Sequence, residues 1–511
     1  MISLNCTDET NFLLVGSTNP PLRVNRVIEG EDPIKLARES FLANMDDYSR
    51  KQKSRSTSKR SPSPSNASNP SSFRERQQDE KLRIACGRPR EVEEAIPATL
   101  LHPVFGQFID DSRTHTITED DNNLVDELAN AMSALHDTEK KRVETVSEVL
   151  SRYKLGFRLN SKVQGTAYFT DAEMSVEVQN YRHSFVIAEF KNEAAVSSSE
   201  PYMQALSYYL ESTRVSAPRM SGSALPCFLL ILFGPYIVFA GAVWTLRPAV
   251  QILSSPLAFN YHSTDTDNQV TAARHMAAFC KAVKSLERYY KTLPPESELA
   301  NRLSHPILFP YPTSFIALDD NSKQNFNYRE HLGQDEGNPK RLIFFGTLAE
   351  GDAKVAICIK FVRRYSRDAH MHCALSGVAP RLRGFEKLPG GWYMVVMDEI
   401  VGYDVLADLP NTDLLPRSVF QAIGEQLKTL HARQLVHGDI RDTNILVKKD
   451  DWTKFMIIDF DWAGVEDVVR YPPYVNYTKI KRPHEARDGL PITAAHDLAM
   501  LDSIIETRAE N

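Results

Sequence analysis

Two short stretches near the carboxyl end carry residues whose types and spacing could do chemistry. The first contains Asp439 and, five positions later, Asn444, and the second places Asp459 directly after the apolar residues 455–458. Phosphoryl transfer needs a carboxylate at the attacking hydroxyl and oxygen ligands for Mg²⁺, because catalysis there is mostly positioning and charge neutralisation. Asp439 suits the first role, and Asn444 with Asp459 suits the second. A polar loop between apolar strands is the alternative interpretation, which this spacing disfavours.

The neighbouring sequence predicts the elements that hold these residues. Leu435-Val436 and residues 455–458 have the apolar character of short buried strands that end at the polar groups. Between residues 416 and 431, apolar residues recur at intervals of three or four behind a proline, which predicts a helix with one buried face. The residues of that face are Val419, Ile423, Leu427 and Leu430.

The pattern resembles the protein kinase-like superfamily, whose catalytic loop reads His-Arg-Asp-x4-Asn and whose metal loop reads Asp-Phe-Gly. Here Gly438 replaces the Arg and Asp461 replaces the last Gly. The resemblance implies that Arg441 is the catalytic-loop cation that neutralises the transferring phosphoryl group, and that Asp497 braces the loop from below. Residues 355–496 resemble the fungal-type protein kinases, while the His-Gly-Asp form also occurs in small-molecule kinases and atypical protein kinases.

The same resemblance assigns the nucleotide site. Residues 354–362 form an apolar strand pattern that carries Lys360, which matches the kinase lysine that holds the α and β phosphates of ATP. Asp398 ends a strand that leads into the expected adenine-binding hinge. The glycine-rich loop is degraded, because Gly346 and Gly351 do not make the usual three-glycine pattern.

Two departures from the kinase pattern leave catalytic competence open. The glutamate that pairs with the lysine is not evident, and Asp368 is a weak candidate for that role. If no carboxylate reaches Lys360, the amine is left unfixed, which favours a pseudokinase. Because the sequence stops at Asn511, we also expect a short C-lobe, either compact or completed by a partner.

A second constellation lies earlier in the chain. Asp171 ends a short strand pattern, and Glu189 and Lys191 stand two apart in the apolar strand of residues 185–191, so their side chains share a face. Asp and Glu could hold a divalent metal while Lys orients or deprotonates water at a phosphodiester. The pattern resembles the restriction-endonuclease-like superfamily, and Gln204 with Tyr208 matches the helix motif of its exonuclease-like branch.

The same residues have a structural interpretation, because exposed strands often carry Glu and Lys as a solvated pair and the Gln-Tyr face can simply pack. An acidic residue on the preceding helix, Glu144 or Glu148, would complete the site, and the sequence does not choose between them. A nuclease-like module joined to such a kinase is similar to Crinkler-type fusions. The resemblance implies a nucleic-acid partner for this module.

Other sequence features concern the cellular setting. Residues 224–246 are apolar enough to suggest a membrane span, but Gly234-Pro235 divides them, which favours two buried strands over a helix. The six cysteines lack metal-site or disulfide spacing, and the first residues lack a secretory signal pattern. We therefore expect an intracellular protein, cytoplasmic or nuclear, with no membrane partner. The net charge of −6 gives no overall attraction to nucleic acid.

The predicted fold class is α/β and α+β multidomain, in which a restriction-endonuclease-like module precedes a bilobal protein kinase-like domain. The expected parts are an N-terminal segment that is disordered over about 50–78, a nuclease-like domain, a linker with the start of the N-lobe, and the kinase-like domain. Their ranges are residues 1–95, 96–293, 294–340 and 341–511.

Three functional hypotheses follow. The first is an ATP- and Mg²⁺-dependent kinase that phosphorylates Ser or Thr hydroxyls of a protein substrate. The second is a metal-dependent nuclease with the kinase-like domain as its regulator. The third is a pseudokinase that acts as a binding module.

Overall fold

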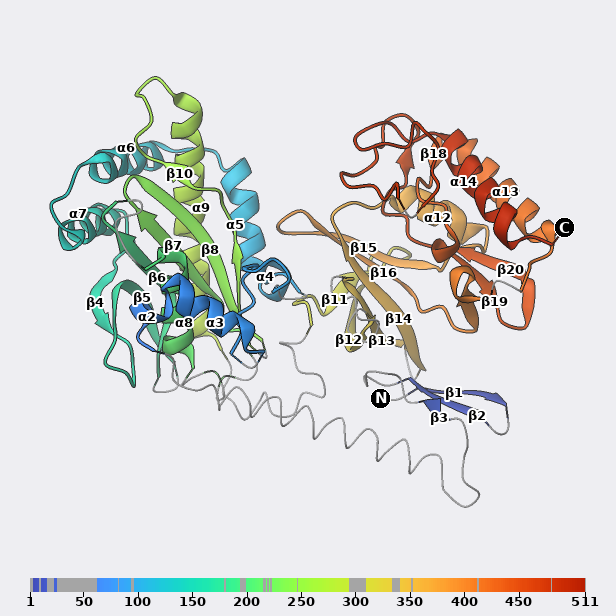
Figure 1. Cartoon of the computed structure of the whole chain (residues 1–511), viewed down its shortest axis with the longest axis horizontal. Helices are drawn as coiled ribbons and strands as arrows, with labels where there is room; N and C mark the ends of the chain where they lie inside the picture. Colours follow the sequence, from blue (N-terminus) through green and yellow to red (C-terminus); the bar gives the residue numbers. More distant parts are fainter. Residues whose placement is uncertain are drawn as a thin grey trace, which may run out of the picture. The chain divides into compact units, whose positions relative to one another are not determined.

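The chain divides into two compact units, which are described separately (Figure 1). The first comprises residues 1–311 with 334–341, and the second comprises residues 312–333 with 342–511. The computed structural model describes residues 3–8, 11–15, 23–24, 62–80, 82–92, 96–178, 181–193, 199–214, 217, 220, 223–245, 247–293, 309–332, 341–350, 353–410, 413–478 and 480–510.

A large mixed sheet is the centre of the first unit. Its strand order is β10-β8-β7-β6-β5-β4, and β9 also pairs with β8. The pairs β5–β6 and β7–β8 are antiparallel, whereas β6–β7 is parallel and is joined through helix α8. The strands are β4 (Arg158–Lys162), β5 (Phe169–Val178), β6 (Tyr181–Lys191), β7 (Cys227–Phe233), β8 (Tyr236–Trp244), β9 (Pro248–Ile252) and β10 (Leu257–Ala258).

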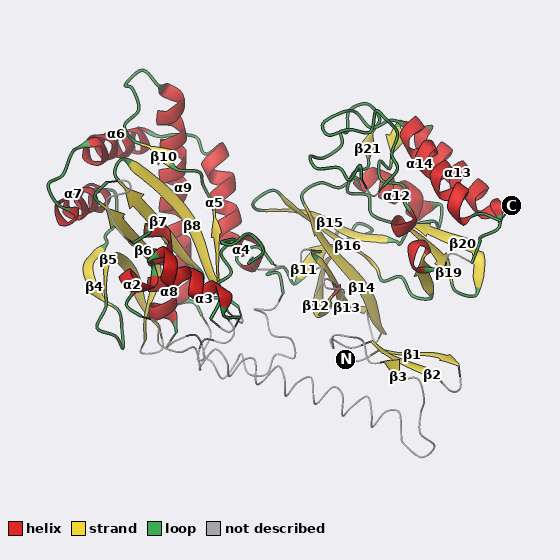
Figure 2. Ribbon diagram, in the orientation of Figure 1, coloured by secondary structure: helices red, strands yellow, loops and turns green. Residues whose placement is uncertain are grey.

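Helices cover both faces of this sheet (Figure 2). Phe228 of β7 contacts Phe105 and Phe108 of α5 and Phe279 of α9, with ring centroids 5.1–5.7 Å apart, which places α5 and α9 on one face. Helix α8 packs against β6 and β7. The helices are α2 (Pro64–Ala67), α3 (Pro70–Gln78), α4 (Ala98–Leu101), α5 (Pro103–Thr114), α6 (Glu119–Ser133), α7 (Glu139–Arg152), α8 (Pro201–Thr213) and α9 (Thr266–Lys291).

The apolar run of residues 224–246 forms strands β7 and β8 around the turn at Gly234-Pro235, as expected. Both strands are almost wholly buried, because helices cover both faces of the sheet, and this explains their uniform apolar sequence. Among the described residues, no helix has the length and apolar character that crossing a membrane requires.

The predicted disorder over about 50–78 is wrong for residues 64–78, which form helices α2 and α3. Phe73 is buried, and the amide of Gln77 both accepts from the backbone N–H of Ile84 at 2.8 Å and donates to the carbonyls of Ile84 and Arg88. A buried apolar side chain and a satisfied polar one therefore offset the ordering entropy of this polar segment. Residues 50–61 lie outside the described residues. The first unit also contains a small antiparallel sheet of β1 (Ser3–Asp8), β2 (Asn11–Val15) and β3 (Arg23–Val24).

The second unit begins with an antiparallel sheet, of order β11-β12-β13-β14-β16-β15. Its first two strands fall within residues 294–340, where the sequence predicts a linker and the start of the N-lobe. Helix α12 (Arg367–Leu375) follows the strand that carries Lys360. The strands are β11 (Ser314–Ile316), β12 (Lys323–His331), β13 (Ile343–Glu350), β14 (Ala353–Val362), β15 (Leu382–Leu388) and β16 (Trp392–Asp398).

The rest of the second unit is mainly helical and is built on α13. Helix α13 begins after Pro416 and buries the predicted face of residues 419, 423, 427 and 430, around which the core of this part packs. Two short sheets, β17-β19-β20 and β18-β21, flank it. The elements are β17 (Tyr403–Val405), η3 (Leu406–Asp408), α13 (Arg417–His431), β18 (Leu435–Val436), η4 (Asp442–Asn444), β19 (Ile445–Lys448), β20 (Asp451–Ile457), β21 (Gly464–Val465) and α14 (Ala494–Arg508).

The aromatic cluster around Phe228 makes a stability prediction. The Phe228→Ala substitution removes a fully buried ring that touches three other rings, so it should lower the free energy of unfolding of the first unit by about 3–5 kcal/mol. Urea denaturation of the full chain measures this change. Leu135→Ala is the control, because Leu135 is 90% exposed. Equal effects of the two substitutions would show that the cluster is not a core.

Candidate active site

The catalytic loop of the second unit is held by the carboxylate of Asp497 on α14. This carboxylate accepts hydrogen bonds from the backbone N–H groups of His437 and Gly438, both at 2.8 Å, and lies 3.0 Å from Nε2 of His431. Asp497 is 1% exposed, and these donors supply the hydrogen bonds that a buried carboxylate requires. The structure thus places Asp497 where the sequence comparison expects a brace.

Gly438 occupies a place that no side chain can share without movement. Its φ is +82°, and a Cβ there would lie 2.9 Å from Cδ1 of Ile492 and 3.0 Å from the carbonyl oxygen of Trp462. The left-handed backbone and the filled space both favour glycine. This explains the Gly in the His-Gly-Asp sequence.

Asp439 and Asn444 meet on this loop. The Asn444 side-chain N–H group donates to the backbone carbonyl of Asp439 at 2.8 Å and to its Oδ2 at 3.1 Å. Arg441 reaches the same Oδ2 through Nη2 at 2.9 Å. The three residues that the sequence assigns to catalysis are therefore one connected group.

Arg482 also contacts Asp439. Its Nη2 lies 2.7 Å from Oδ1 of Asp439, and its side chain is only 2% exposed. Arg482 belongs to the irregular segment between β21 and α14, forty-three positions from its partner. No spacing or periodicity in the sequence indicates this contact.

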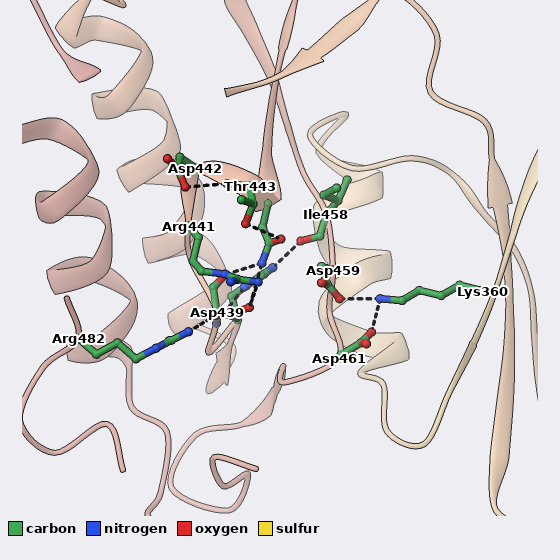
Figure 3. Close-up of polar contacts among 11 residues, drawn as sticks. Lys360, Asp439, Arg441, Asp442, Thr443, Ile458, Asp459, Asp461 and Arg482 are labelled. Carbon is green, nitrogen blue, oxygen red and sulfur yellow. Dashed lines mark hydrogen bonds and ion pairs between the residues drawn. The ribbon is translucent and has the colours of Figure 1, made fainter. Parts of the chain in front are cut away.

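Lys360 lies between two carboxylates across the site from Asp439 (Figure 3). Its Nζ is 2.5 Å from Oδ1 of Asp459 and 2.5 Å from Oδ1 of Asp461. Burial acts to lower the pKa of Lys360, but the two carboxylates together raise it above its ordinary value, so the amine stays charged. Lys360 in return holds the pKa of Asp459 below its usual range, against the effect of burial.

The expected partner of Lys360, Asp368, does not make this contact. Among the described residues, the carboxylates within ion-pair distance of Lys360 are those of Asp459 and Asp461. From helix α12, which carries Asp368, His370 instead reaches the site and stacks on Phe460 at a centroid distance of 4.8 Å. Lys360 is therefore fixed by two carboxylates, and no unfixed lysine favours a pseudokinase here.

Asp398 and Gly346 have structural roles in the sheet. Asp398 ends β16, and its carboxylate pairs with Arg383 of β15. Gly346 lies within strand β13, where a Cβ would come 2.7 Å from the backbone oxygen of Asn327, so close strand packing requires glycine there. Gly351 lies outside the described residues.

The residues present suit Mg²⁺ with a nucleotide. The N–H of Ile458 donates to the carbonyl of Asn444 at 3.0 Å, which fixes Asn444 beside the segment that bears Asp459. An amide oxygen and a carboxylate are hard ligands, and Mg²⁺ commonly uses one or two carboxylates together with substrate phosphates. In the described part of the chain, no group of three or more His, Cys, Asp and Glu side chains could hold a metal, so phosphate oxygens would have to complete this site.

The first unit brings the second predicted constellation together. Asp171 of β5 and Glu189 of β6 lie on paired strands, each next to one member of the register pair Ala172 and Ala188. Oδ2 of Asp171 accepts from the N–H of Phe190 at 2.9 Å, and Oε1 of Glu189 lies 2.7 Å from Nζ of Lys191. Burial, and then the charge of Asp171, raise the pKa of Glu189 well above its usual range.

The residues that surround this pair come from two helices. Gln204 and Tyr208 lie on α8, and the charges of Glu189 and Asp171 add to the burial that raises the pKa of Tyr208. The acidic residue from the preceding helix is Glu139, with Oε2 3.7 Å from Nζ of Lys191. The expectation of Glu144 or Glu148 is wrong, because Glu144 pairs with Lys140 and Glu148 with Arg152 on the exposed side of α7.

Comparison with known proteins agrees with a kinase-like second unit. A family model described as the lipopolysaccharide kinase (Kdo/WaaP) family matches residues 390–484, which include the catalytic loop and Asp459. A curated relative, the 3-deoxy-D-manno-octulosonic acid kinase of Mannheimia succiniciproducens, is 42% identical over 62 residues, which are 12% of this chain and 25% of the relative. The chain thus spans about a quarter of that relative's length.

Two solved kinases are also similar in structure, at low sequence identity. They are the Cydia pomonella granulovirus kinase PK-1, with 14% identity and a TM-score of 0.27 over 41% of this chain and 70% of that one, and vaccinia related kinase 3, with 15% identity and a TM-score of 0.27 over 38% and 68%. The match to the family model and the local geometry together identify the second unit as a kinase-like domain. The similarity to fungal-type kinases stays a prediction.

The paired carboxylates at Lys360 predict a pH dependence of stability. Burial and the neighbouring Asp459 raise the pKa of Asp461 to about 7 despite Lys360. From about pH 4 to 7 the folded state then binds more protons at Asp461 than the unfolded state does, so its contribution to stability falls as pH rises through this window. Relative to Asp461→Asn, the melting temperature of the wild-type kinase-like domain should therefore decrease across this window and run parallel above it.

Scanning calorimetry at several pH values measures this difference. Asp450→Asn is the control, because Asp450 is an exposed carboxylate of the same domain and its loss should leave the wild-type profile unchanged. Parallel curves for wild type and Asp461→Asn from pH 4 to 7 would contradict the raised pKa.

Proposed function

We propose that the protein is an ATP- and Mg²⁺-dependent phosphotransferase that phosphorylates a hydroxyl group. The observation that carries this proposal is the pairing of Lys360 with Asp459 and Asp461 on one side of the site, with Asp439 and Asn444 on the other. Phosphoryl transfer requires such groups, because charge must be neutralised at the phosphates and the acceptor must be oriented.

The chain's own residues have distinct tasks in this reaction. Asp439 accepts the proton of the acceptor hydroxyl, whose oxygen forms a bond to the γ-phosphorus as the bond to the β–γ bridging oxygen breaks and ADP leaves. Lys360 has three N–H donors, of which two point to Asp459 and Asp461, and the third is available to a phosphate oxygen. Asn444 and Asp459 would hold Mg²⁺, which would supply positive charge to the nucleotide phosphates.

The class of acceptor is a narrower proposal. The resemblance to protein kinases supports a Ser or Thr hydroxyl of a protein, and the curated relative, named as a kinase of a sugar acid, supports a sugar hydroxyl. Both acceptors use the same residues, because each presents an alcohol to Asp439. Labelled ATP offered with a protein array and with a set of sugars separates the two.

Loss of the catalytic carboxylate should abolish transfer. The Asp439→Asn substitution keeps the size of the side chain but removes the proton acceptor, so kcat for transfer from labelled ATP should fall by about 10²–10⁴-fold with little change in nucleotide affinity. Asp450→Asn is the matched control, since Asp450 is exposed and its carboxylate lies beside Nζ of Lys448, at 3.4 Å. Wild-type binding of nucleotide without transfer to any acceptor would instead support a pseudokinase binding module.

We propose metal-dependent phosphodiester cleavage as a second candidate function, located in the first unit. The observation that favours it is the buried carboxylate of Glu189, which faces Lys191 and Asp171 while its Oε2 has no hydrogen-bond partner. Two neighbouring carboxylates in a buried site favour a bound cation. The order of helix α7, strands β4–β6, helix α8 and parallel strand β7 also supports a restriction-endonuclease-like core, for which nucleic acid would be the partner.

The lysine of this cluster provides the test. Lys191→Ala removes the group proposed to orient the attacking water, so nicking of a supercoiled plasmid in Mg²⁺ or Mn²⁺ should fall by at least tenfold. Lys140→Ala is the matched control, because Lys140 is an exposed lysine of α7. Equal nicking by wild type and Lys191→Ala would assign the activity elsewhere.

A further inference from the structure

The catalytic carboxylate of the kinase-like domain faces more positive charge than it balances. Arg482 contacts Oδ1 of Asp439 at 2.7 Å, and Arg441 contacts Oδ2 at 2.9 Å. Two guanidinium groups therefore share one carboxylate, which leaves the group with a positive charge of about one unit. Figure 3 shows both arginine side chains converging on Asp439.

These arginines also keep hydrogen-bond donors that nothing in the described structure satisfies. Nε and Nη1 of Arg482 and Nε of Arg441 are buried and have no partner among the described residues. The Arg482 side chain is 2% exposed, and its guanidinium carbon lies 5.0 Å from the centre of the Trp462 ring, which holds the group against an aromatic face. Buried guanidinium donors are usually paired with carboxylate or phosphate oxygens, because an unpaired buried donor is costly.

The hydrogen bonds of Asp439 decide where an acceptor hydroxyl can bind. Oδ2 accepts a hydrogen bond from Asn444 and forms an ion pair with Arg441, whereas Oδ1 contacts only Arg482 among the described residues. With one neighbouring side chain instead of two, Oδ1 is the less crowded oxygen for an acceptor hydroxyl. A hydroxyl that donates to Oδ1 lies directly beside the Arg482 guanidinium.

We propose that the phosphate acceptor carries an anionic oxygen group, a carboxylate or a phosphate, close to the hydroxyl that is phosphorylated, and that Arg482 with Arg441 binds this group. The proposal rests on the phosphotransferase function proposed above and defines its substrate class. The anion balances the second guanidinium and satisfies the unpaired N–H groups, while the hydroxyl reaches Oδ1. Arg482 is thus a specificity-determining residue.

A set of acceptors that share one scaffold provides the test. D-Glucitol, D-gluconate and D-glucitol 6-phosphate have the same chain of hydroxyls and differ in a terminal alcohol, carboxylate or phosphate. Their binding to the full chain saturated with Mg²⁺ and ADP is measured by titration calorimetry. We expect wild type to bind at least one anionic compound tenfold or more tightly than D-glucitol, and the two anionic arms identify the preferred group.

Variants of the two arginines link that preference to the site. Arg482→Gln should remove the tenfold preference, and Arg482→Lys, which keeps the charge, should retain part of it. Arg487→Gln is the matched control, because Arg487 lies in the same segment and packs over Tyr477. Melting temperatures equal to that of wild type establish that each variant is folded, and Arg482→Lys serves if Arg482→Gln is not.

Two results would overturn the proposal. One is equal or undetectable binding of all three compounds by wild type, and the other is a preference that persists in Arg482→Gln. If Arg482→Gln instead accelerates transfer to neutral and anionic acceptors alike, Arg482 blocks Asp439 and binds no substrate. Anion binding without transfer from labelled ATP would refute the phosphotransferase function alone, so the two failures are distinguishable.

Discussion

The kinase-like domain depends on a buried ammonium group that joins its two parts. Lys360 comes from the antiparallel sheet, and its two carboxylate partners follow strand β20 in the helical part. A buried lysine is costly unless it is paired, so the pair forces the sheet and the metal loop into contact. Asp461 stands where the kinase pattern has glycine, and it supplies the second carboxylate.

In the kinase pattern a glutamate pairs with this lysine, and the helix after the lysine strand was expected to supply the carboxylate. Here Asp459 and Asp461 take that role. In α12 the residue that reaches the metal loop is His370, which is buried, stacks on Phe460 and holds Tyr365 at 2.7 Å. Burial lowers the pKa of His370 to about 4, so at neutral pH the ring is an uncharged packing group. The charged partners of Lys360 thus follow strand β20, whereas α12 contributes an uncharged packing group.

How much the sequence could predict depends on the distance along the chain. Asp439, Asn444 and Asp459 are close in sequence and follow apolar strands, so local pattern was enough to group them. Arg482 and Glu139 each join their site from an irregular segment or a helix end, where no periodicity exists to reveal them. Helices α2 and α3 were not predicted because their segment contains few apolar residues. The polar side chain of Gln77 anchors them by hydrogen bonds to backbone groups of Ile84.

The two large sheets differ in how far their topology could be anticipated. The apolar runs of β7 and β8 predicted buried strands, yet the parallel pairing of β6 with β7 follows only from the crossover through α8. Likewise, the strand pattern around Lys360 was evident, whereas its pairing with β13 and β16 is a tertiary result. The strands themselves were thus easier to predict from the sequence than the order in which they pair.

The close fit of Gly438 couples the segment that carries Arg482 and Ile492 to the catalytic loop. Ile492 fills the space beside Gly438, and Arg482, ten positions earlier, touches Asp439. One stretch of chain therefore supplies both the side chain that packs beside Gly438 and the cation that contacts Asp439. A movement of this stretch would therefore shift the packing beside Gly438 and the cation at Asp439 together.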